Sequence, residues 1–498
     1  MVILDPIYYV ALPLLTAFLL PLFGKLYKPL IGIIPGLVFL FLAYMSVMLM
    51  IEVTPEDPII TKIAGWNPPF GINLVFSSFS GFIASLISIM AFLIWGYSYN
   101  FKKVGFDDSL KYFILLMLVV TGTIGIVLTG DIFNLFVFLE ITAISSYALT
   151  AIYRGRDGAE AAFKFLLIGA FASSMILLAI ILLYSQVGTL NMAEIAVRMP
   201  EVDFNIKILI FILFFVGFGI EAEMFPLNGW VPDAYSQAPG PIAAVFAGMV
   251  AKAGIYALIR VIYLMFDLEG AFGLLLIMGL ITMIVAEVVA LRQEKLRRML
   301  AYSSIGQMGL IMIAFSINTE QGVFAAIFLM FNHALIKSLL FLTTSFLVYN
   351  SKSKLISDLD GFGKKMPLVS LLFGLGAFAL VGLPPFSGFW SKLYVLIAAA
   401  DQHMELIIAL ILSVSVVEII YYFKVISRLY FRKASEEIPI QKPSINSSVV
   451  MIIMGSLIVL VGVYPDLITG LIENATTSLM NKGIYIEKVL PGLAEIIN

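Results

Sequence analysis

The chain has 498 residues, of which 61% are hydrophobic and 12% are charged, with a formal net charge of −2 at pH 7. A charged fraction this low excludes a soluble globular protein and indicates an all-α polytopic membrane protein. The absence of cysteine excludes disulfides and thiolate metal sites, and two histidines, His333 and His403, leave no multi-histidine site. We therefore expect no catalytic site, no cofactor, no metal and no nucleic-acid partner.

Apolar runs along the chain predict fourteen membrane-spanning helices, because about 20 apolar residues cross the hydrocarbon core of a bilayer. The first run has no basic leading segment and no small-residue cleavage site, so we interpret it as a span rather than a removed signal. A short surface helix is expected over 475–497. The expected spans are 5–24, 30–51, 73–97, 111–129, 131–152, 161–186, 207–225, 241–265, 271–292, 299–317, 321–349, 367–400, 404–430 and 447–471.

Lysine and arginine are distributed unevenly among the loops that connect these spans. Alternate loops hold most of them, whereas the remaining loops and both termini hold few and are rich in acidic residues. The positive-inside rule then predicts that the basic loops are cytoplasmic and that both termini lie outside the plasma membrane. The basic loops contain Lys25, Lys28, Lys102, Lys103, Lys111, Arg154, Arg156, Arg292, Lys295, Arg297, Arg298, Lys352, Lys354, Lys364, Lys365, Arg428, Arg432 and Lys433.

Two spans are interrupted by proline and glycine. The seventh is broken at Pro226 and Pro232, and the twelfth at Pro384 and Pro385. These spans lie five helices apart, and because five is odd the second copy is inverted relative to the first. Paired interrupted spans in inverted halves indicate a transport site near the membrane midplane. The alternative is two ordinary proline kinks, which membrane helices tolerate.

Titratable residues lie in the middle of several spans. Glu140 is about 14 Å deep in the fifth span and Lys252 roughly 16 Å deep in the eighth, from the helical rise of about 1.5 Å per residue. Ionisable groups at this depth usually mark an ion or proton path. The further residues that we assign to this path are Glu221, Glu223, His333, Lys337 and Lys392.

Such residues suit proton transfer because a path through a low-dielectric region needs groups that take up and release protons. Burial lowers the pKa of a lysine and raises that of a glutamate toward neutrality, while a neighbouring opposite charge counteracts both shifts. Histidine is a natural relay between such groups. The alternatives are that a buried Lys–Glu pair only bridges two helices, and that Lys337 extends toward the membrane interface.

Several polar neighbours are assigned to packing instead of to the path. Ser303, Ser304 and Gln307 are expected to hold helices together, and Tyr421 and Tyr422 to belong to an aromatic belt at the membrane interface. Three further charged residues are placed nearer the ends of their helices, namely Glu287, Glu418 and Lys424.

Five motifs are similar to those of a known family: NLFVFLE at 134–140, FPLNGWVPDA at 225–234, KAGIYALIR at 252–260, NHALIKSLLF at 332–341 and GLPPFSGFWSK at 382–392. They resemble the large antiporter-like subunits of respiratory complex I, Mrp-type sodium/proton antiporters and archaeal membrane-bound hydrogenases and sulfur reductases. The resemblance implies fourteen helices, with inverted five-helix repeats over helices four to eight and nine to thirteen. The implied regions are 1–110, a first repeat over 111–265, a second repeat over 271–430, and helix fourteen with a short C-terminal surface segment over 447–498.

The resemblance also implies roles for individual residues. The family's helix-five glutamate corresponds to Glu140, its helix-eight lysine to Lys252, and its helix-eleven histidine to His333, with Lys337 one turn later. Its helix-twelve lysine corresponds to Lys392. These residues are expected to form a proton path along the membrane midplane.

One position departs from the family pattern. The family usually has a lysine four residues before the Phe-Pro of broken helix seven, where this chain has Glu221, with Glu223 close by. Three outcomes are open: Lys164 or Lys252 supplies the missing cation beside Glu140, the carboxylates bind a cation, or this half of the path is inactive. The clustered carboxylates make a sodium-handling role more attractive.

Our interpretation is a subunit that translocates protons, Na⁺ or both. The resemblance implies other membrane subunits beside it in an Mrp-like or complex I-like assembly within the lipid bilayer, and in the hydrogenase-like complexes a peripheral hydrogenase or reductase arm. Any enzymatic activity would belong to that complex. The alternatives are a structural or inactive paralogue and, with less support from the few His and absent Cys, a quinone-reactive oxidoreductase subunit.

Overall fold

The computed structural model describes residues 4–66, 68, 71–99, 106–266, 268–433 and 440–491. Within these residues, thirteen helices are long and apolar enough to cross a membrane. A shorter apolar helix, α16 (Pro367–Val381), combines with α17 (Ser387–Asp401) as the broken fourteenth. The predicted all-α polytopic fold is therefore confirmed. Lys102 and Lys103 of the second basic loop and the end of the predicted surface helix lie outside the described residues.

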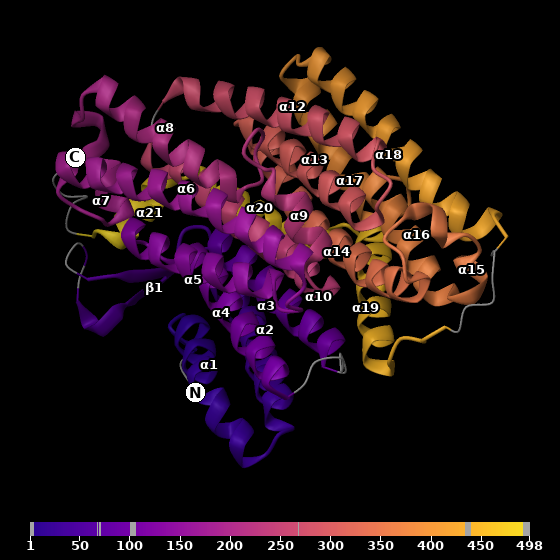
Figure 1. Cartoon of the computed structure of the whole chain (residues 1–498). Coiled ribbons are helices and arrows are strands. Elements are labelled where there is room, and N and C mark those ends of the chain that lie inside the picture. Colours follow the sequence, from indigo (N-terminus) through magenta and orange to yellow (C-terminus); the bar gives the residue numbers. More distant parts are fainter. Residues whose placement is uncertain are drawn as a thin grey trace.

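The N-terminal region contains two membrane helices, a β-hairpin and a third helix (Figure 1). The hairpin was not predicted: 73–76 form a strand where the sequence suggested the start of a span. Ile59 pairs with Phe76, and Lys62 with Asn73. The next helix starts after Ser77, whose side chain caps it by accepting from the Ser80 N–H. The elements are α1 (Tyr8–Leu26), α2 (Leu30–Glu52), β1 (Ile59–Lys62), η1 (Ile63–Gly65), β2 (Asn73–Phe76) and α3 (Ser78–Ser98).

The first repeat continues to the end of the eighth span. Its last span is one helical stretch, Gly240–Met265, in which two π segments flank a central α-helix. Single π turns inside α-helices are frequent at functional sites. The elements are α4 (Phe106–Leu128), α5 (Ile132–Thr150), α6 (Arg156–Val187), α7 (Met192–Arg198), η2 (Met199–Glu201), α8 (Phe204–Glu221), α9 (Trp230–Gln237), α10 (Gly240–Val245), η3 (Phe246–Val250), α11 (Ala251–Arg260) and η4 (Val261–Met265).

The second repeat follows the same plan. Helices α6 and α14 both have 32 residues. In each repeat an isolated antiparallel bridge joins the segment before one helix to the segment after the next, Asp131 with Asn191 and Lys295 with Leu355. The elements are α12 (Glu269–Leu291), α13 (Leu296–Ser316), α14 (Glu320–Ser351), η5 (Ile356–Leu359), α15 (Phe362–Lys365), α16, α17 and α18 (Glu405–Phe431).

The two broken spans end their first halves in the same way. Helices α8 and α16 are each followed by a residue with left-handed backbone conformation, Glu223 (φ 64°) and Gly382 (φ 94°). In both, two successive N–H groups bond back to carbonyls of the preceding turn, the Schellman arrangement that closes a helix. Pro226 and Pro385 then follow in the gaps. Pro232 was predicted to be part of the first break but lies in the first turn of α9, where its missing N–H costs nothing.

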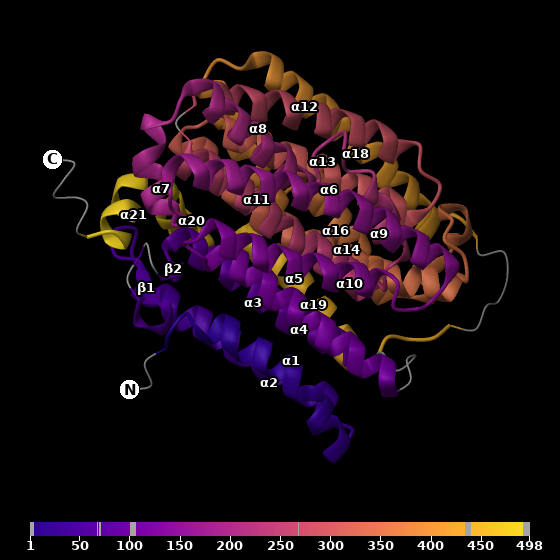
Figure 2. The same cartoon turned by 60° about the vertical axis from the view of Figure 1, so that its left-hand side comes forward.

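The C-terminal region differs from the prediction. Helix α19 (Ile445–Val463) ends before Pro465 rather than at 471, and the expected single surface helix is two helices, α20 (Asp466–Met480) and α21 (Lys482–Val489). They pack on the bundle: Ile472 of α20 is fully buried, and the Arg260 guanidinium lies 4.0 Å from the ring centroid of Tyr485 in α21. Figure 2 shows α21 beside α7 and the β-hairpin, at one end of the bundle.

Large apolar side chains cover much of the outer surface. Phe18 of α1, Phe163 of α6, and Leu406 and Phe423 of α18 are all more than half exposed. Water-soluble proteins rarely expose contiguous apolar faces of this kind. The outside of the bundle is therefore a surface for lipid or for neighbouring membrane subunits, and this is a multi-pass membrane protein.

Candidate functional site

Several hydrogen-bonded groups of buried titratable and hydroxyl-bearing side chains lie in the interior, and we call them together the network. It begins at Lys252 of α11, which is fully buried. The Lys252 ammonium donates to the Ala247 carbonyl at 2.9 Å, within the π segment η3, and is hydrogen bonded to Nδ1 of His333 in α14. The other ring nitrogen of His333, Nε2, lies 3.2 Å from the Ser304 hydroxyl of α13. Two predicted path residues thus meet directly.

Lys337 stands one turn after His333 on α14 and is also fully buried. Its ammonium donates to the Ser303 hydroxyl at 2.7 Å and to the Tyr422 hydroxyl at 3.2 Å. These contacts keep the charge inside the protein, so the alternative that Lys337 extends to the membrane interface is wrong. The lysine instead links α14 with α13 and α18.

Tyr421 extends this network to another helix. Its hydroxyl lies 2.9 Å from Oε2 of Glu287 in α12 and 2.7 Å from the Ser303 hydroxyl. A hydroxyl has only one proton to donate, so Tyr421 can donate to the carboxylate while it accepts from the serine, or donate to the serine instead. The group can therefore rearrange without any helix moving.

A further group of the network is an ion pair next to the second break, which acts electrostatically on Lys337. Lys392 of α17 pairs with Glu418 of α18, and Glu418 also accepts a hydrogen bond from the Gln307 amide. Lys392 further donates to the Val381 carbonyl at 3.1 Å. Val381 is the last residue of α16, whose terminal carbonyls lack intrahelical donors. The lysine therefore stabilises the broken helix as well as the glutamate.

The first break places a carboxylate against the start of this network. Glu223 is fully buried, and its Oε1 accepts a hydrogen bond from the Tyr235 hydroxyl. Within the described chain its other oxygen, Oε2, has no hydrogen-bond partner. Lys252 and Lys337 both act electrostatically on this carboxylate. Glu223 is thus an acid near enough to act on both buried lysines, while Glu287 and Glu418 also act on Lys337.

The backbone at Glu223 supports a role beyond packing. A side chain in the left-handed conformation costs about 1 kcal/mol or more compared with glycine. We expect Glu223→Gly to lower ion transport by the purified complex, because it removes the carboxylate that acts on Lys252 and Lys337. Its thermal midpoint should not rise, because the relief of this backbone cost is offset by the cavity and by the buried Tyr235 hydroxyl that loses its acceptor. Gly382→Ala, at the matching position, should lower the midpoint, and a transport rate unchanged by Glu223→Gly would contradict the role.

Glu140 of α5 lies apart from this network. It is partly buried and accepts a hydrogen bond from the Ser173 hydroxyl of α6. Glu221 is 8% exposed and acts electrostatically with Glu140. Lys164 does not reach them, because it pairs with Glu160 at 2.8 Å and with Asp233 at 3.0 Å. The lysine suggested as a partner for Glu140 is thus bound elsewhere, and the group found to donate to Glu140 is the Ser173 hydroxyl.

Several residues of the network have other surroundings than the sequence predicts. Tyr421 and Tyr422 are buried and bonded to charged groups rather than lying in an interfacial belt, and Ser303, Ser304 and Gln307 contact the titratable residues rather than only packing. A spacing signal was available, because Ser303 and Gln307 are four residues apart on one helical face. Glu287 does lie near the end of α12, as predicted, whereas Glu418 lies in the middle of α18, and both are at most 1% exposed.

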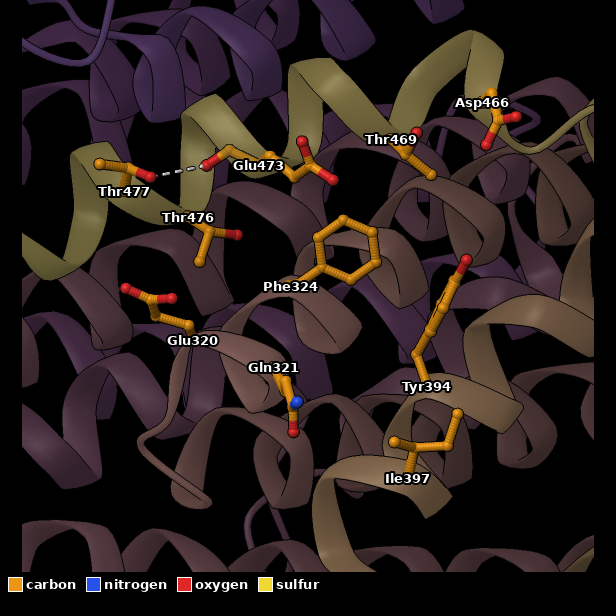
Figure 3. Close-up of a pocket in the computed structure, with 10 residues that line it drawn as sticks. All are labelled: Glu320, Gln321, Phe324, Tyr394, Ile397, Asp466, Thr469, Glu473, Thr476 and Thr477. Atoms are coloured by element: carbon orange, nitrogen blue, oxygen red, sulfur yellow. Dashed lines mark hydrogen bonds between the residues drawn. The ribbon is translucent and has the colours of Figure 1, made fainter. Parts of the chain in front are cut away.

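A separate cavity of about 590 Å³ opens beside α20 (Figure 3). Asp466 and Glu473 of α20 and Glu320 of α14 give it an acidic lining, which favours cations over anions. Its lining contains none of the network residues described above. In the part of the chain that the structure describes, no group of three or more His, Cys, Asp or Glu side chains is arranged to hold a metal ion.

The chain is similar to known proteins over most of its length. Residues 129–418 match the family described as NADH:quinone oxidoreductase/Mrp antiporter, TM. NADH-quinone oxidoreductase subunit N of Desulforudis audaxviator is 33% identical over 435 residues, which are 86% of each chain. A chain of the membrane-bound sulfane sulfur reductase, an archaeal respiratory membrane complex, is 39% identical, with a TM-score of 0.91 over 97% of this chain and 99% of that one. A chain of the Mrp complex from Dietzia sp. shares the fold, with a TM-score of 0.90, 24% identity, and coverage of 98% and 100%.

Proposed function

Because this chain belongs to the NADH:quinone oxidoreductase/Mrp antiporter transmembrane family, we propose that it moves protons, Na⁺ or both through its buried network. The chain is an antiporter-like subunit of the Mrp or complex I type. The observation that carries the proposal is the direct bond between Lys252 and His333 inside the protein. Burying two proton-accepting groups side by side costs free energy. Ionisable groups inside a membrane protein therefore usually mark an ion or proton path.

The contacts suggest how a proton would pass. A proton on Lys252 can be handed to Nδ1 of His333, and the ring can release one from Nε2 toward Ser304. Lys337, one turn away, is the next site, with Ser303 and Tyr422 as hydroxyl relays. Transfer to the Lys392–Glu418 pair would then need water or side-chain rotation.

Glu223 would control the first of these steps. Its negative charge favours the protonated form of Lys252, so movement of the carboxylate toward or away from the lysine would change which group holds the proton. The break between α8 and α9 gives the carboxylate a backbone that is not held within a continuous helix. This is the kind of interrupted segment that forms transport sites in proteins with inverted repeats.

We propose the orientation and partners from the loop charges and the relatives. The basic loops would face the cytoplasm and both termini the outside, by the positive-inside rule. Other membrane subunits would surround the chain, since the archaeal relative belongs to a respiratory membrane complex and the bacterial one is named as a subunit. A peripheral hydrogenase or reductase arm would supply the driving reaction.

Substitution of Lys337 tests the proposal. Lys337→Gln keeps a polar side chain near Ser303 but cannot carry a proton, so we expect ion movement by the intact complex in vesicles to fall roughly 10-fold or more. Lys424→Gln is the matched control, because Lys424 is an exposed lysine. Its ammonium lies 3.5 Å from the Gln293 carbonyl, which is not part of the network. A rate equal to that of the control would contradict the proposal.

A second candidate function is a structural or inactive paralogue in the same kind of complex. The observation that favours it is Glu221, which stands where the family pattern has a lysine. Unchanged ion movement with Lys337→Gln, together with normal assembly, would support this alternative. Loss of ion movement with normal assembly would exclude it.

A further inference from the structure

Another cavity, of about 440 Å³, opens where the two repeats meet. Its lining comes from the first turn of α6, the loop before it and the end of α9 in the first repeat, and from the start of α13 and the segment after α14 in the second. An excess of positive charge in such a hollow attracts anions. The charged residues that line it are four cations and one acid, namely Arg154, Arg156, Arg297, Lys354 and Asp157.

The fold places two of these cations on neighbouring segments. The Leu296 N–H donates to the Lys354 carbonyl at 3.0 Å, which fixes the next residue, Arg297, beside Lys354. Nη1 of Arg297 donates to the Ala238 carbonyl, after α9, at 3.1 Å. The Lys354 ammonium donates to the side-chain oxygen of Gln237, the last residue of α9, at 2.9 Å. Both acceptors are neutral, so these bonds position the two cations without neutralising them.

Acidic side chains balance only part of the positive charge. Arg154 pairs with Asp108, which does not line the cavity, at 2.8 Å. Lys354 lies 3.8 Å from Asp157, whose side chain is 72% exposed. An ion pair this exposed contributes little. Among the residues that the structure describes, the other two arginines of the cavity form no ion pair.

Arg297 is the more constrained of these two arginines. Its Nε is buried and has no hydrogen-bond partner in the described part of the chain. A guanidinium has five N–H donors, and the bond to the Ala238 carbonyl uses only one of the two groups on Nη1. Burying a charged group with unsatisfied donors costs free energy. An anion in the cavity would supply the missing countercharge and further acceptors.

The start of α6 adds a second feature that favours an anion. Arg156 is the first residue of this 32-residue helix, and Gly155 before it has no side chain to cap the first N–H groups. The first N–H groups of a helix lack intrahelical acceptors and attract anions, phosphate above all. The space beside Gly155 is open, since a side chain there would meet no atom within 4 Å. A ligand can therefore approach these N–H groups.

We infer that this cavity binds a phosphate group, with Arg297, Arg156 and the start of α6 as its principal donors. Guanidinium groups match the geometry of phosphate oxygens and often bind them through two parallel bonds. Two sources carry this chemistry, the headgroup of an anionic phospholipid and a soluble phosphate. Tyr153, which also lines the cavity, is 49% exposed, and basic pockets between membrane helices bind anionic headgroups. The inference concerns binding and does not depend on the proposed ion movement.

Binding of radiolabelled phosphatidylglycerol to the purified intact complex, in detergent with excess phosphatidylcholine, tests the site. We expect Arg297→Gln to weaken binding roughly 10-fold or more, because a charge-assisted hydrogen bond is lost. Arg156→Gln should weaken it about 5-fold, since that arginine is exposed. Arg292→Gln is the matched control, because Arg292 is an exposed arginine just after α12 and does not line the cavity.

Equilibrium dialysis with radiolabelled inorganic phosphate forms the second arm. Weakened binding of either ligand in Arg297→Gln and Arg156→Gln, but not in Arg292→Gln, supports the site, and the ligand that responds identifies the source. Unchanged binding of both ligands in both cavity variants would overturn the inference. An equal loss in the control would also overturn it, because general surface charge would then explain the binding. If Arg297→Gln prevents assembly, Arg156→Gln decides, since an exposed arginine is not needed for folding.

Discussion

Replacement of Lys252 by alanine is expected to abolish ion movement by the intact complex in membrane vesicles. Lys252 is fully buried and is bonded to His333 and to the Ala247 carbonyl. Alanine cannot hold a proton and leaves a gap that His333 cannot bridge by itself. A pH-sensitive dye inside the vesicles would report the loss when the complex is driven by its own reaction.

The complex should still assemble without Lys252, because burying an ammonium costs free energy that alanine does not require. Subunit composition after purification checks this point. Lys424→Ala provides the control, since Lys424 is an exposed lysine on α18. Normal proton movement in Lys252→Ala would remove this residue from the path, whatever the other variants show.

Loss of the Lys392–Glu418 ion pair by substitution of the lysine is expected to have the largest effect on stability. Among the residues that the structure describes, Lys392→Met would leave the fully buried Glu418 with only the Gln307 amide as a partner. Breaking one side of a buried ion pair costs about 3 kcal/mol or more, because an uncompensated charge remains. It would also remove the donor to the Val381 carbonyl. The thermal midpoint of the complex should therefore fall clearly.

The double variant Lys392→Met with Glu418→Leu shows whether the pair is a proton site or only a structural bridge between two helices. Two apolar side chains of similar volume often replace a buried ion pair without loss of stability. We expect the midpoint to recover most of the way while ion movement stays lost. If ion movement recovers together with stability, the pair only joins α17 to α18, as the alternative interpretation holds.

The broken spans were predictable because their signals are local. A proline lacks the N–H that a helix interior needs, so Pro226, Pro384 and Pro385 mark the gaps wherever the helices pack. The same local signal gave a wrong prediction at Pro232, where we expected a break. A proline is compatible with the first turn of a helix, and Pro232 lies in the first turn of α9. Sequence alone could not show that Glu223, rather than a glycine, occupies the left-handed position after α8.

The partners of the charged residues were not predictable in the same way. Lys337 is bonded to Ser303 and Tyr422, which come from α13 and α18. Helical periodicity shows which residues share a face with Lys337, but not which helix packs against that face. For this reason Tyr422 fitted an interfacial belt equally well until the packing was known.

The amino-acid sequence by itself determined that this chain lies in a membrane, where its spans are broken, and how deep Glu140 and Lys252 are along their helices. These are properties of one segment at a time, since hydropathy and proline act within a helix. Only the tertiary structure decided that Lys252 meets His333 and that Lys164 pairs with Asp233 rather than with Glu140. Such pairings depend on how helices far apart in the chain pack together, which no single segment specifies.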